Sequence, residues 1–248
     1  MKEHTQNKRK IIVTSALPYA NSSLHLGHIL EAVQTDIWVR FQNQNSNQCL
    51  YFCADDTHGT PVMLKAKELN LSAEELIGIV RIDHIETYEK YGIKFTNFHS
   101  THSDENKKIA QEIYNSSKKN NLITKKVINQ LYDTKEKMFL SDRFIKGTCP
   151  KCSAEDQYGD GCGVCNAAFS VEELIKPIST LSNTKPVLKE TEHIFFDLPS
   201  KKGSIKEFLD KATLQEPIVN KLREWVNDGL KKWDISRDAP YFGFEIPD

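Results

Sequence analysis

The sequence has no hydrophobic run long enough to cross a membrane. Its apolar stretches are short, such as CLYFCA at 49–54, whereas a membrane-spanning helix needs about 20 apolar residues in succession. The N-terminal segment MKEHTQNKRK is polar and basic, and no apolar segment follows it, so we expect no secretory signal peptide. These absences predict a cytoplasmic protein with no membrane partner.

The sequence also lacks an excess of charge of either sign. Its 33 basic and 34 acidic residues give a net charge of −1, so the composition does not indicate a nucleic-acid binder, and any such contact would rest on local patches. Hydrophobic residues make up 39% and charged residues 27%, which is typical of a globular protein. A chain of 248 residues suffices for one large domain or two smaller ones.

Cysteine is scarce outside one short segment. Cys49 and Cys53 flank an apolar stretch and are expected to be ordinary buried thiols. The other four form the pattern C-x2-C-x9-C-x2-C: Cys149, Cys152, Cys162 and Cys165. Two CxxC turns can wrap one tetrahedral Zn²⁺. Four thiolates leave no open coordination position, so this zinc would be structural. Two disulfides are the alternative, which a cytoplasmic location disfavours.

Strands and helices alternate in the N-terminal half. Residues 9–15 are interpreted as a short buried strand, the apolar positions between 26 and 43 recur at helical spacing, and 49–54 is a second strand. This order predicts a βαβ unit with parallel strands. A capping box, Ser72 with Glu75, predicts a helix that runs toward residue 91. A strand at 97–101 and a helix from about 103 to 119 complete a third unit.

The pattern of predicted strands and helices changes after about residue 120. Strand-like runs occupy 122–147 and 193–198, and helices are predicted at about 204–212 and 217–232. We therefore divide the chain into three parts. They are the first half of an α/β nucleotide-binding domain at 1–117, an inserted module at 118–235 with the cysteine segment at about 145–168, and a return into the first domain at 236–248.

The turn ALPYANSSLHLGH follows the first strand and opens a helix. Ligands bind to open α/β sheets at such places, and a helix N-terminus favours phosphate. His25 and His28 are three residues apart and lie on one face of the first helical turn. Imidazoles there can donate hydrogen bonds to phosphate oxygens in a transition state. Gly27 keeps side chains away from a ligand that approaches the backbone.

These residues resemble a known family. His25-Leu26-Gly27-His28 is similar to the HIGH signature of class I aminoacyl-tRNA synthetases, with Leu for Ile. The wider strings ALPYANSSLHLGH, ADDTHGTP at 54–61 and the stretch at 233–243, which includes ISRDAPYFG, resemble the methionyl-tRNA synthetases. The resemblance implies a Rossmann-like parallel sheet, of which this chain holds the first half, and an inserted connective-peptide module with a zinc knuckle. It covers the chain from Lys10 onward but only the front part of the family's length.

The resemblance also implies roles for individual residues. It makes the chain part of an enzyme that activates methionine with Mg·ATP and transfers it to tRNA(Met). His25, Gly27 and His28 would bind ATP. Without the resemblance, we expect one aspartate of the ADDTHGTP string, Asp55 or Asp56, to cap the next helix. The methionine-binding residues implied are Leu17, Tyr19, Asp56, which would bind the α-ammonium group, and His99. Arg237 would be an active-site residue near the substrate carboxylate, paired with Asp56.

One motif of the class is missing. We find no KMSKS-like second ATP motif, because Ser200-Lys201-Lys202-Gly203-Ser204 lies inside the inserted module. We therefore expect these 248 residues alone to be inactive or nearly so, and homodimerisation would depend on C-terminal regions that are absent here. Two other readings stay open: a class I synthetase for another amino acid or a related nucleotidyltransferase, and a non-catalytic zinc-containing module that binds tRNA or protein.

Overall fold

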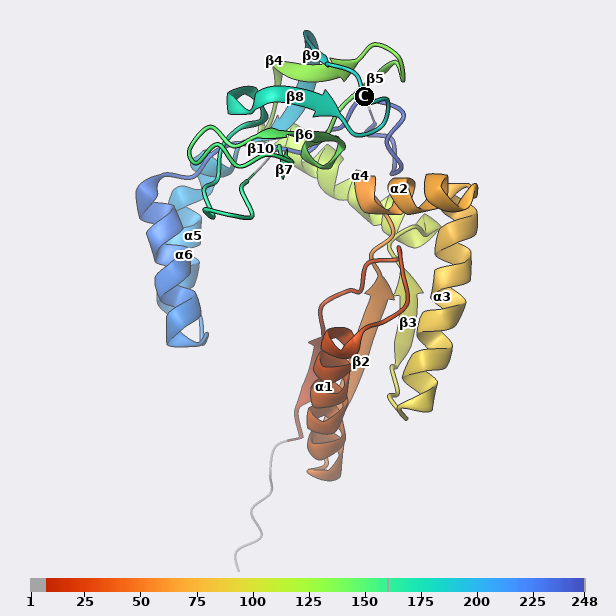
Figure 1. Cartoon of the computed structure of the whole chain (residues 1–248). Helices are drawn as coiled ribbons and strands as arrows, with labels where there is room; N and C mark the ends of the chain where they lie inside the picture. The colour runs from red at the N-terminus through yellow and green to blue at the C-terminus, as the bar shows by residue number, and fades with distance from the viewer. Residues whose placement is uncertain (1–7, 160, 248) are drawn as a thin grey trace, which may run out of the picture. The chain divides into compact units, whose positions relative to one another are not determined.

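A computed structural model describes residues 8–159 and 161–247 (Figure 1). They divide into two compact units, 8–108 with 242–244, and 109–241 with 245–247. The predicted division at 117/118 and 235/236 concerns the domain organisation of a whole synthetase and stays a prediction. No helix in the described ranges is both long and apolar enough to cross a bilayer.

The first unit alternates strands and helices in the predicted order. Its elements are β1 (Lys10–Thr14), α1 (Leu26–Gln44), β2 (Gln48–Asp55), α2 (Thr60–Leu69), α3 (Ala73–Lys90), β3 (Asn97–Ser100) and the start of α4 (Asp104–Lys119). The strands form a parallel sheet in the order β1-β2-β3. Because parallel strands end at the same edge of a sheet, the segments that follow Thr14, Asp55 and Ser100 meet there.

Two apolar clusters hold this unit together. One joins α1 to the sheet and to the end of α3 through buried Ile29, Val39, Tyr51 and Tyr88. The other joins α2 to α3 and is built around Val62, whose side chain is fully buried. The sheet is therefore fixed to α1 and α3, and α2 is fixed to α3.

The prediction that the first strand is buried is wrong. Ile12 of β1 is 73% exposed, and Ile37, Trp38 and Phe41 on α1 are exposed as well. The physical reason is position, since in the described chain β1 is an edge strand that pairs with β2 alone. By contrast, Cys49 and Cys53 are buried as predicted, and burial raises the pKa of each thiol.

Helix α2 is an element that the sequence analysis does not predict. Its N-cap is Gly59, which has a φ of 95° and makes no side-chain cap hydrogen bond. The expectation that Asp55 or Asp56 caps the next helix is therefore wrong. Glycine adopts a positive φ readily, and a proline such as Pro61 is compatible with the first turn of a helix.

The second unit is built on a long antiparallel ribbon. Strand β4 (Ile123–Asp133) pairs with β9 (Val187–Phe196) from Ile123↔Phe196 to Tyr132↔Val187. With β5 (Met138–Phe139) and β10 (Trp233–Asp234) it forms a sheet of order β10-β9-β4-β5. A smaller antiparallel sheet of order β7-β6-β8 carries the cysteines: β6 (Ile145–Thr148), β7 (Gln157–Tyr158) and β8 (Ile175–Ser179).

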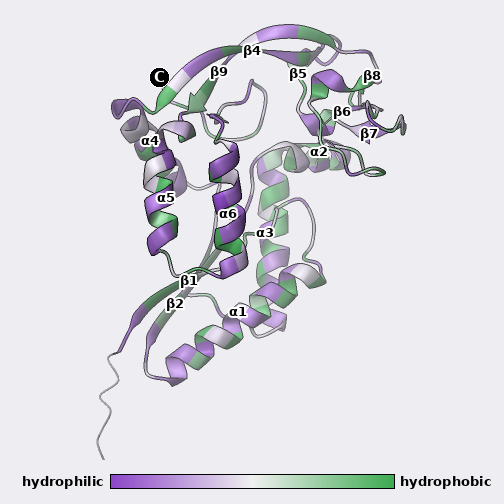
Figure 2. Ribbon diagram, turned by 90° about the vertical axis from the view of Figure 1, so that its left-hand side faces the viewer, coloured by the Kyte–Doolittle hydropathy of each residue, from purple (hydrophilic) through white to green (hydrophobic). Residues whose placement is uncertain are grey.

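Two helices of the second unit lie side by side (Figure 1). They are α5 (Lys202–Lys211) and α6 (Glu216–Asp228), along which hydrophilic and hydrophobic residues alternate (Figure 2). The second predicted helix ends earlier than the predicted residue 232. Gly229, with a φ of 107°, is the reason, because that backbone conformation does not continue a helix.

The capping box of α3 gives a test of the stability of the first unit. The Ser72 hydroxyl accepts from the Glu75 amide at 3.1 Å, and the Glu75 carboxylate accepts from the Ser72 amide at 2.8 Å. Ser72→Ala is expected to lower the free energy of unfolding by about 1 kcal/mol, measured by urea denaturation. The control is Ser116→Ala inside α4, where alanine is the better helix former. Equal losses in both variants would contradict the cap.

Candidate active site and metal centre

The LPYA segment continues beside the end of β2. The Asp56 amide donates to the Pro18 carbonyl, and the Ala20 amide donates to the Asp56 carbonyl, each at 2.8 Å. Tyr19 and Asp56 are thereby paired as in a parallel sheet. The backbone itself holds the predicted methionine-binding tyrosine and acid as neighbours at the carboxyl edge.

The two histidines of HLGH form a capping box at the start of α1. Nδ1 of His25 accepts from the Gly27 amide at 3.0 Å, and Nδ1 of His28 accepts from the His25 amide at 3.4 Å. The two rings stack with centroids 3.7 Å apart. Because both Nδ1 atoms accept, each neutral ring carries its proton on Nε2. Two Nε2–H donors are therefore left for a ligand.

Gly27 is required by this arrangement. A Cβ at Gly27 would lie 2.8 Å from Cε1 of His25, which is closer than van der Waals contact. Burial lowers the pKa of His28, and the neighbouring His25 and His84 lower it further. The neutral, Nε2-protonated form of His28 is thus the favoured one at neutral pH.

The predicted methionine-binding residues leave surface free for a ligand. Leu17 and Tyr19 are 42% and 41% exposed, although both are large apolar side chains. Burial raises the pKa of Tyr19, and the charge of Asp56 raises it further. Burial also raises the pKa of Asp56, a shift that its hydrogen bond with the His58 backbone opposes. A half-buried carboxylate of this kind gains from a cationic partner.

The remaining two predicted residues lie on different units. His99 is at the end of β3, with Nε2 at 3.4 Å from a carboxylate oxygen of Glu105. Arg237 belongs to the second unit, where Nη1 lies 2.7 Å from the Ser236 carbonyl and 3.7 Å from the Asp234 carboxylate. The predicted pairing of Arg237 with Asp56 stays a prediction.

Two histidine contacts escape the sequence analysis. His58 and His102, which follow β2 and β3, share a hydrogen bond of 2.9 Å between Nε2 and Nδ1, and the Phe242 and Phe244 rings pack on His58. Their positions directly after strand ends are the signal that points to them. The other is His84 on α3, which is fully buried beside Asp55, and no sequence pattern marks it.

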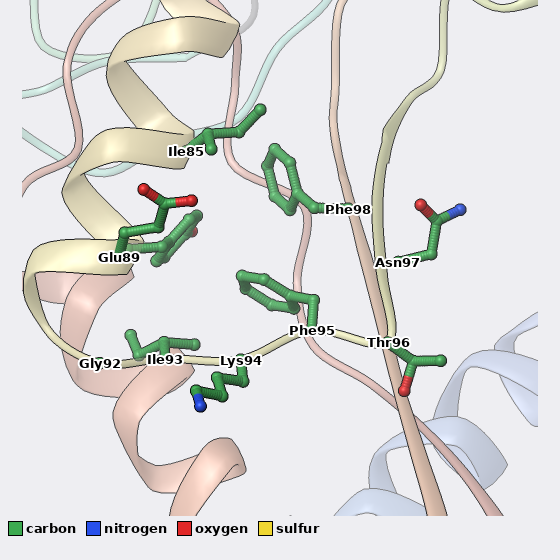
Figure 3. Close-up of a pocket in the computed structure, with 10 residues that line it drawn as sticks. Ile85, Glu89, Gly92, Ile93, Lys94, Phe95, Thr96, Asn97 and Phe98 are labelled. Carbon is green, nitrogen blue, oxygen red and sulfur yellow. The ribbon is translucent and has the colours of Figure 1, made fainter.

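A cavity of about 490 Å³ lies away from these residues. It opens between the end of α3 and the segment leading into β3, and Ile85, Phe95 and Phe98 line its apolar side (Figure 3). This is the amino end of β3, whereas the candidate residues follow the carboxyl ends of the strands. We therefore assign the cavity no part in the candidate site.

Two turns of the same design bring the four cysteines together. In the first, the Cys149 amide donates to the Ala154 carbonyl and the Ser153 amide donates to the Cys149 carbonyl; in the second, Cys162 bonds with Ala167 and Asn166 in the same way. Ser153 and Asn166 both have a positive φ, 62° and 57°. The CxxC pairs are thus two copies of one knuckle.

The sulfur positions fit a tetrahedral metal ion. All four Sγ atoms lie within 4.8 Å of one another, with 3.8 Å between Cys149 and Cys165 and 3.6 Å between Cys152 and Cys162. Tetrahedral Zn–S bonds of about 2.3 Å place sulfurs roughly 3.8 Å apart, whereas a disulfide needs about 2.05 Å. Backbone amides of Cys165 and Val164, with the neighbouring thiols, lower the pKa of Cys162 to about 6, whereas the surrounding thiols and burial raise the pKa of Cys152 to about 12. The cluster thus does not favour four thiolates by itself, and a cation would be needed to stabilise them all.

Comparison with known proteins agrees with this geometry. The family model described as "tRNA synthetases class I (M)" matches residues 11–248. The chain belongs to this family. The resemblance carried by HLGH and its neighbouring strings is thereby confirmed at the level of the family.

Solved structures support the fold. Mycobacterium tuberculosis methionyl-tRNA synthetase in complex with methionyl-adenylate superposes with a TM-score of 0.71 at 18% identity, over 97% of this chain and 43% of that one. A second structure of the enzyme from the same organism, bound by methionyl-adenylate, gives 0.70 at 17% identity, over 98% and 43%. The predicted Rossmann-like α/β fold is confirmed, and the chain spans less than half the length of these enzymes.

The contact between Gly27 and the His25 ring yields a prediction. Gly27→Ala should push the His25 ring off the Gly27 amide and cost about 0.5–2 kcal/mol of stability through the lost cap. Histidine-ring NMR shifts of His28 and thermal unfolding measure the two effects. The control is Gly78→Ala on α3, where a Cβ meets nothing within 4 Å and which should stabilise by about 0.5–1 kcal/mol. Unchanged His28 shifts in Gly27→Ala would refute the stacked arrangement.

The cluster of four sulfur atoms yields a second prediction for this site. We expect one Zn²⁺ per chain, measured by elemental analysis after dialysis, and loss of that ion in Cys162→Ser. Cys49→Ala, which lies outside the cluster, should retain it. Removal of zinc from the unmodified chain by a chelator should unfold the β7-β6-β8 sheet, because metal binding and folding are coupled in such sites. Full metal content in Cys162→Ser would count against the four-sulfur site.

Proposed function

We propose that this chain is the front part of a methionine–tRNA ligase, which activates methionine with ATP and transfers it to tRNA(Met) in the cytoplasm. The observation that carries the proposal is the carboxyl edge of the sheet. There the HLGH capping box leaves two Nε2–H donors free at a helix N-terminus, beside a half-buried acid at the end of β2. Family membership supplies the reaction class.

Methionine would be held by the LPYA segment and β2. The Asp56 carboxylate pairs with the α-ammonium group, and this pairing offsets the cost of half-burying the acid. Leu17 and Tyr19 present exposed apolar surface for the flexible thioether chain. His99 lies at the end of the next strand, within reach of the same edge. Because a methylene is worth only about 1–3 kcal/mol in an apolar pocket, the fit must be close.

Activation joins the methionine carboxylate to the α-phosphate of ATP. The carboxylate oxygen attacks phosphorus, the bond to the bridging oxygen breaks, and pyrophosphate leaves with Mg²⁺. His25 and His28 donate through Nε2–H to phosphate oxygens whose charge grows in the transition state. Gly27 allows the His25 ring to pack onto the helix start. Arg237 would orient the substrate carboxylate by charge-assisted hydrogen bonds.

In the second step the terminal adenosine of tRNA takes the methionyl group. One of its ribose hydroxyls attacks the carbonyl carbon of methionyl-adenylate, and AMP leaves. Zinc held by the four cysteines would keep the knuckle module folded without taking part in the chemistry, because four thiolates saturate a tetrahedral ion. We infer that the 248 residues alone catalyse little or no activation, since they hold no second ATP-binding motif.

The assay for the proposal is methionine-dependent ATP–pyrophosphate exchange by the full natural polypeptide that carries this sequence. Screening the other amino acids in the same assay separates the methionine enzyme from a leucine, isoleucine, valine or cysteine enzyme. Tight tRNA binding without exchange for any amino acid would instead support a non-catalytic module. Robust exchange by the 248-residue chain alone would overturn the inference that it is inactive.

The role of Asp56 gives a specific prediction. Asp56→Asn should raise the KM for methionine roughly 10- to 100-fold, because a hydrogen bond to a charged group is lost, and should leave the KM for ATP nearly unchanged. The raised pKa of Asp56 adds a pH effect. Methionine binding needs the ionised acid. As pH is lowered, the affinity for methionine should therefore begin to fall at a higher pH than an ordinary carboxylate would give. Asp104→Asn, at the exposed start of α4, is the control and should change neither constant.

A further inference from the structure

A buried ion pair lies beneath the candidate site and is not used in the chemistry above. Nδ1 of His84 on α3 lies 2.6 Å from Oδ1 of Asp55, the last residue of β2. Both side chains are 0% exposed. The other ring nitrogen, Nε2, lies 2.9 Å from the Ser22 carbonyl oxygen. His84 therefore joins α3 to the end of β2 and to the turn before HLGH.

The partners of His84 favour a doubly protonated ring. The Ser22 carbonyl is an acceptor only, so Nε2 carries a hydrogen. An ionised Asp55 is also an acceptor only, so Nδ1 carries the second one, and the ring is an imidazolium. Burial alone would lower the pKa of His84, but the bonds to Asp55 and Ser22 raise it above its ordinary value. The hydrogen-bond geometry and the raised pKa thus both favour the imidazolium form of His84.

The charged groups around this ring favour the same state. Asp55 on β2 and Asp83 on α3 itself both raise the pKa of His84. The charge of His84 also acts on His28 of α1, whose pKa it lowers. Oδ2 of Asp55 is buried without a hydrogen-bond partner among the described residues. Asp55 consequently depends on His84 for compensation of its charge.

The turn before HLGH depends on the same ring. Residues 18–20 are bonded directly to the end of β2. Leu24 packs on the apolar cluster of α1 and the sheet. Among the described residues, the hydrogen bond that links residues 21–24 to another element is the one from His84 to the Ser22 carbonyl. Asp55 directly precedes Asp56, and Ser22 precedes His25 by three residues. The His84 ring therefore spans the two segments that carry the ammonium-binding acid and the phosphate-binding histidines.

We propose that His84 is a positioning residue that, as an imidazolium clamped between Asp55 and the Ser22 carbonyl, sets the spacing between Asp56 and the HLGH histidines. The inference rests on the proposed function for its catalytic consequence. The reacting groups must be aligned for in-line attack on the α-phosphate, and a displacement of about 1 Å can cost on the order of 100-fold in rate. Loss of the clamp should therefore act on kcat more than on substrate binding.

The test compares His84→Gln with Val80→Ala in methionine-dependent pyrophosphate exchange by the full natural polypeptide. Val80 lies one turn earlier on α3 and is also buried, so its truncation weakens the same helix without touching the clamp. We expect kcat to fall roughly 10- to 100-fold in His84→Gln, with KM values changed less than threefold, and to stay within twofold in Val80→Ala. Equal kcat losses in variants of matched thermal stability would overturn the proposal.

Asp55→Asn gives a second readout, which a purely structural role would not produce. The amide removes the charge that keeps His84 protonated, and burial then lowers the pKa of the ring, so the ring should lose its second proton as pH rises through a range below the ordinary histidine value of about 6.5. We expect kcat of Asp55→Asn to be reduced at pH 7 and to recover as pH is lowered through that range, whereas the unmodified enzyme shows no such loss. A parallel pH profile in both proteins would contradict the clamp, even if His84→Gln does not fold.

Histidine-ring NMR on the 248-residue chain separates this proposal from the proposed function. His84 should show both ring nitrogens protonated at pH 7, and Asp55→Asn should shift the His25 and His28 signals while Val80→Ala leaves them in place. A neutral His84 at pH 7 would overturn the clamp. If the clamp signals are present but the full polypeptide shows no methionine-dependent exchange, the proposed function fails and the structural part of the inference stands.

Discussion

The pairing of the LPYA segment with the end of β2 is the contact on which the candidate site depends. Two backbone hydrogen bonds, from Asp56 to Pro18 and from Ala20 to Asp56, extend the parallel sheet by a few residues beyond β1. A parallel sheet collects the carboxyl ends of its strands at one edge, but it does not fix the loops beyond them. The added pairing fixes residues 18–20 beside Asp56 here, and the bond from His84 to the Ser22 carbonyl links the next part of the turn, which leads to α1, to the same strand end.

Each histidine of the HLGH string caps the helix with one ring nitrogen and keeps the other nitrogen for a ligand. A helix N-terminus leaves amide donors without partners, and in α1 the Nδ1 atoms of His25 and His28 accept from two of them. Ser and Glu meet the same need at Ser72 and Glu75 with the same spacing. A histidine capping box differs because each ring keeps a second nitrogen, whose hydrogen points away from the cap. Structure at the helix start therefore selects the Nε2-protonated tautomer, which can donate a hydrogen bond to a ligand.

The sequence predicts the elements around the candidate site better than the contacts between them. Strand–helix order, the Ser72 cap and the HLGH turn follow from local patterns, and all are present in the structure. Burial of β1 is not predictable locally, because Ile12 would be covered only if another element lay beside this edge strand. The His84–Asp55 pair is also invisible, since 29 positions separate its members and a lone histidine on a helix has no periodic signature. Contacts between elements that are distant in the sequence can be predicted only once the topology of the sheet is known.

The cysteine segment, in contrast, is held by contacts that are local in the sequence. Each knuckle is closed by hydrogen bonds within a few residues of its first cysteine, and Ser153 and Asn166 supply the positive φ that each turn needs. Each short segment thus positions its own two cysteines, and the β7-β6-β8 sheet is needed only to bring the two turns together. A site built in this way can be predicted from spacing alone. The carboxyl edge cannot, because its acid, its histidines and the buried ring beneath them come from three elements that only the folded sheet brings together.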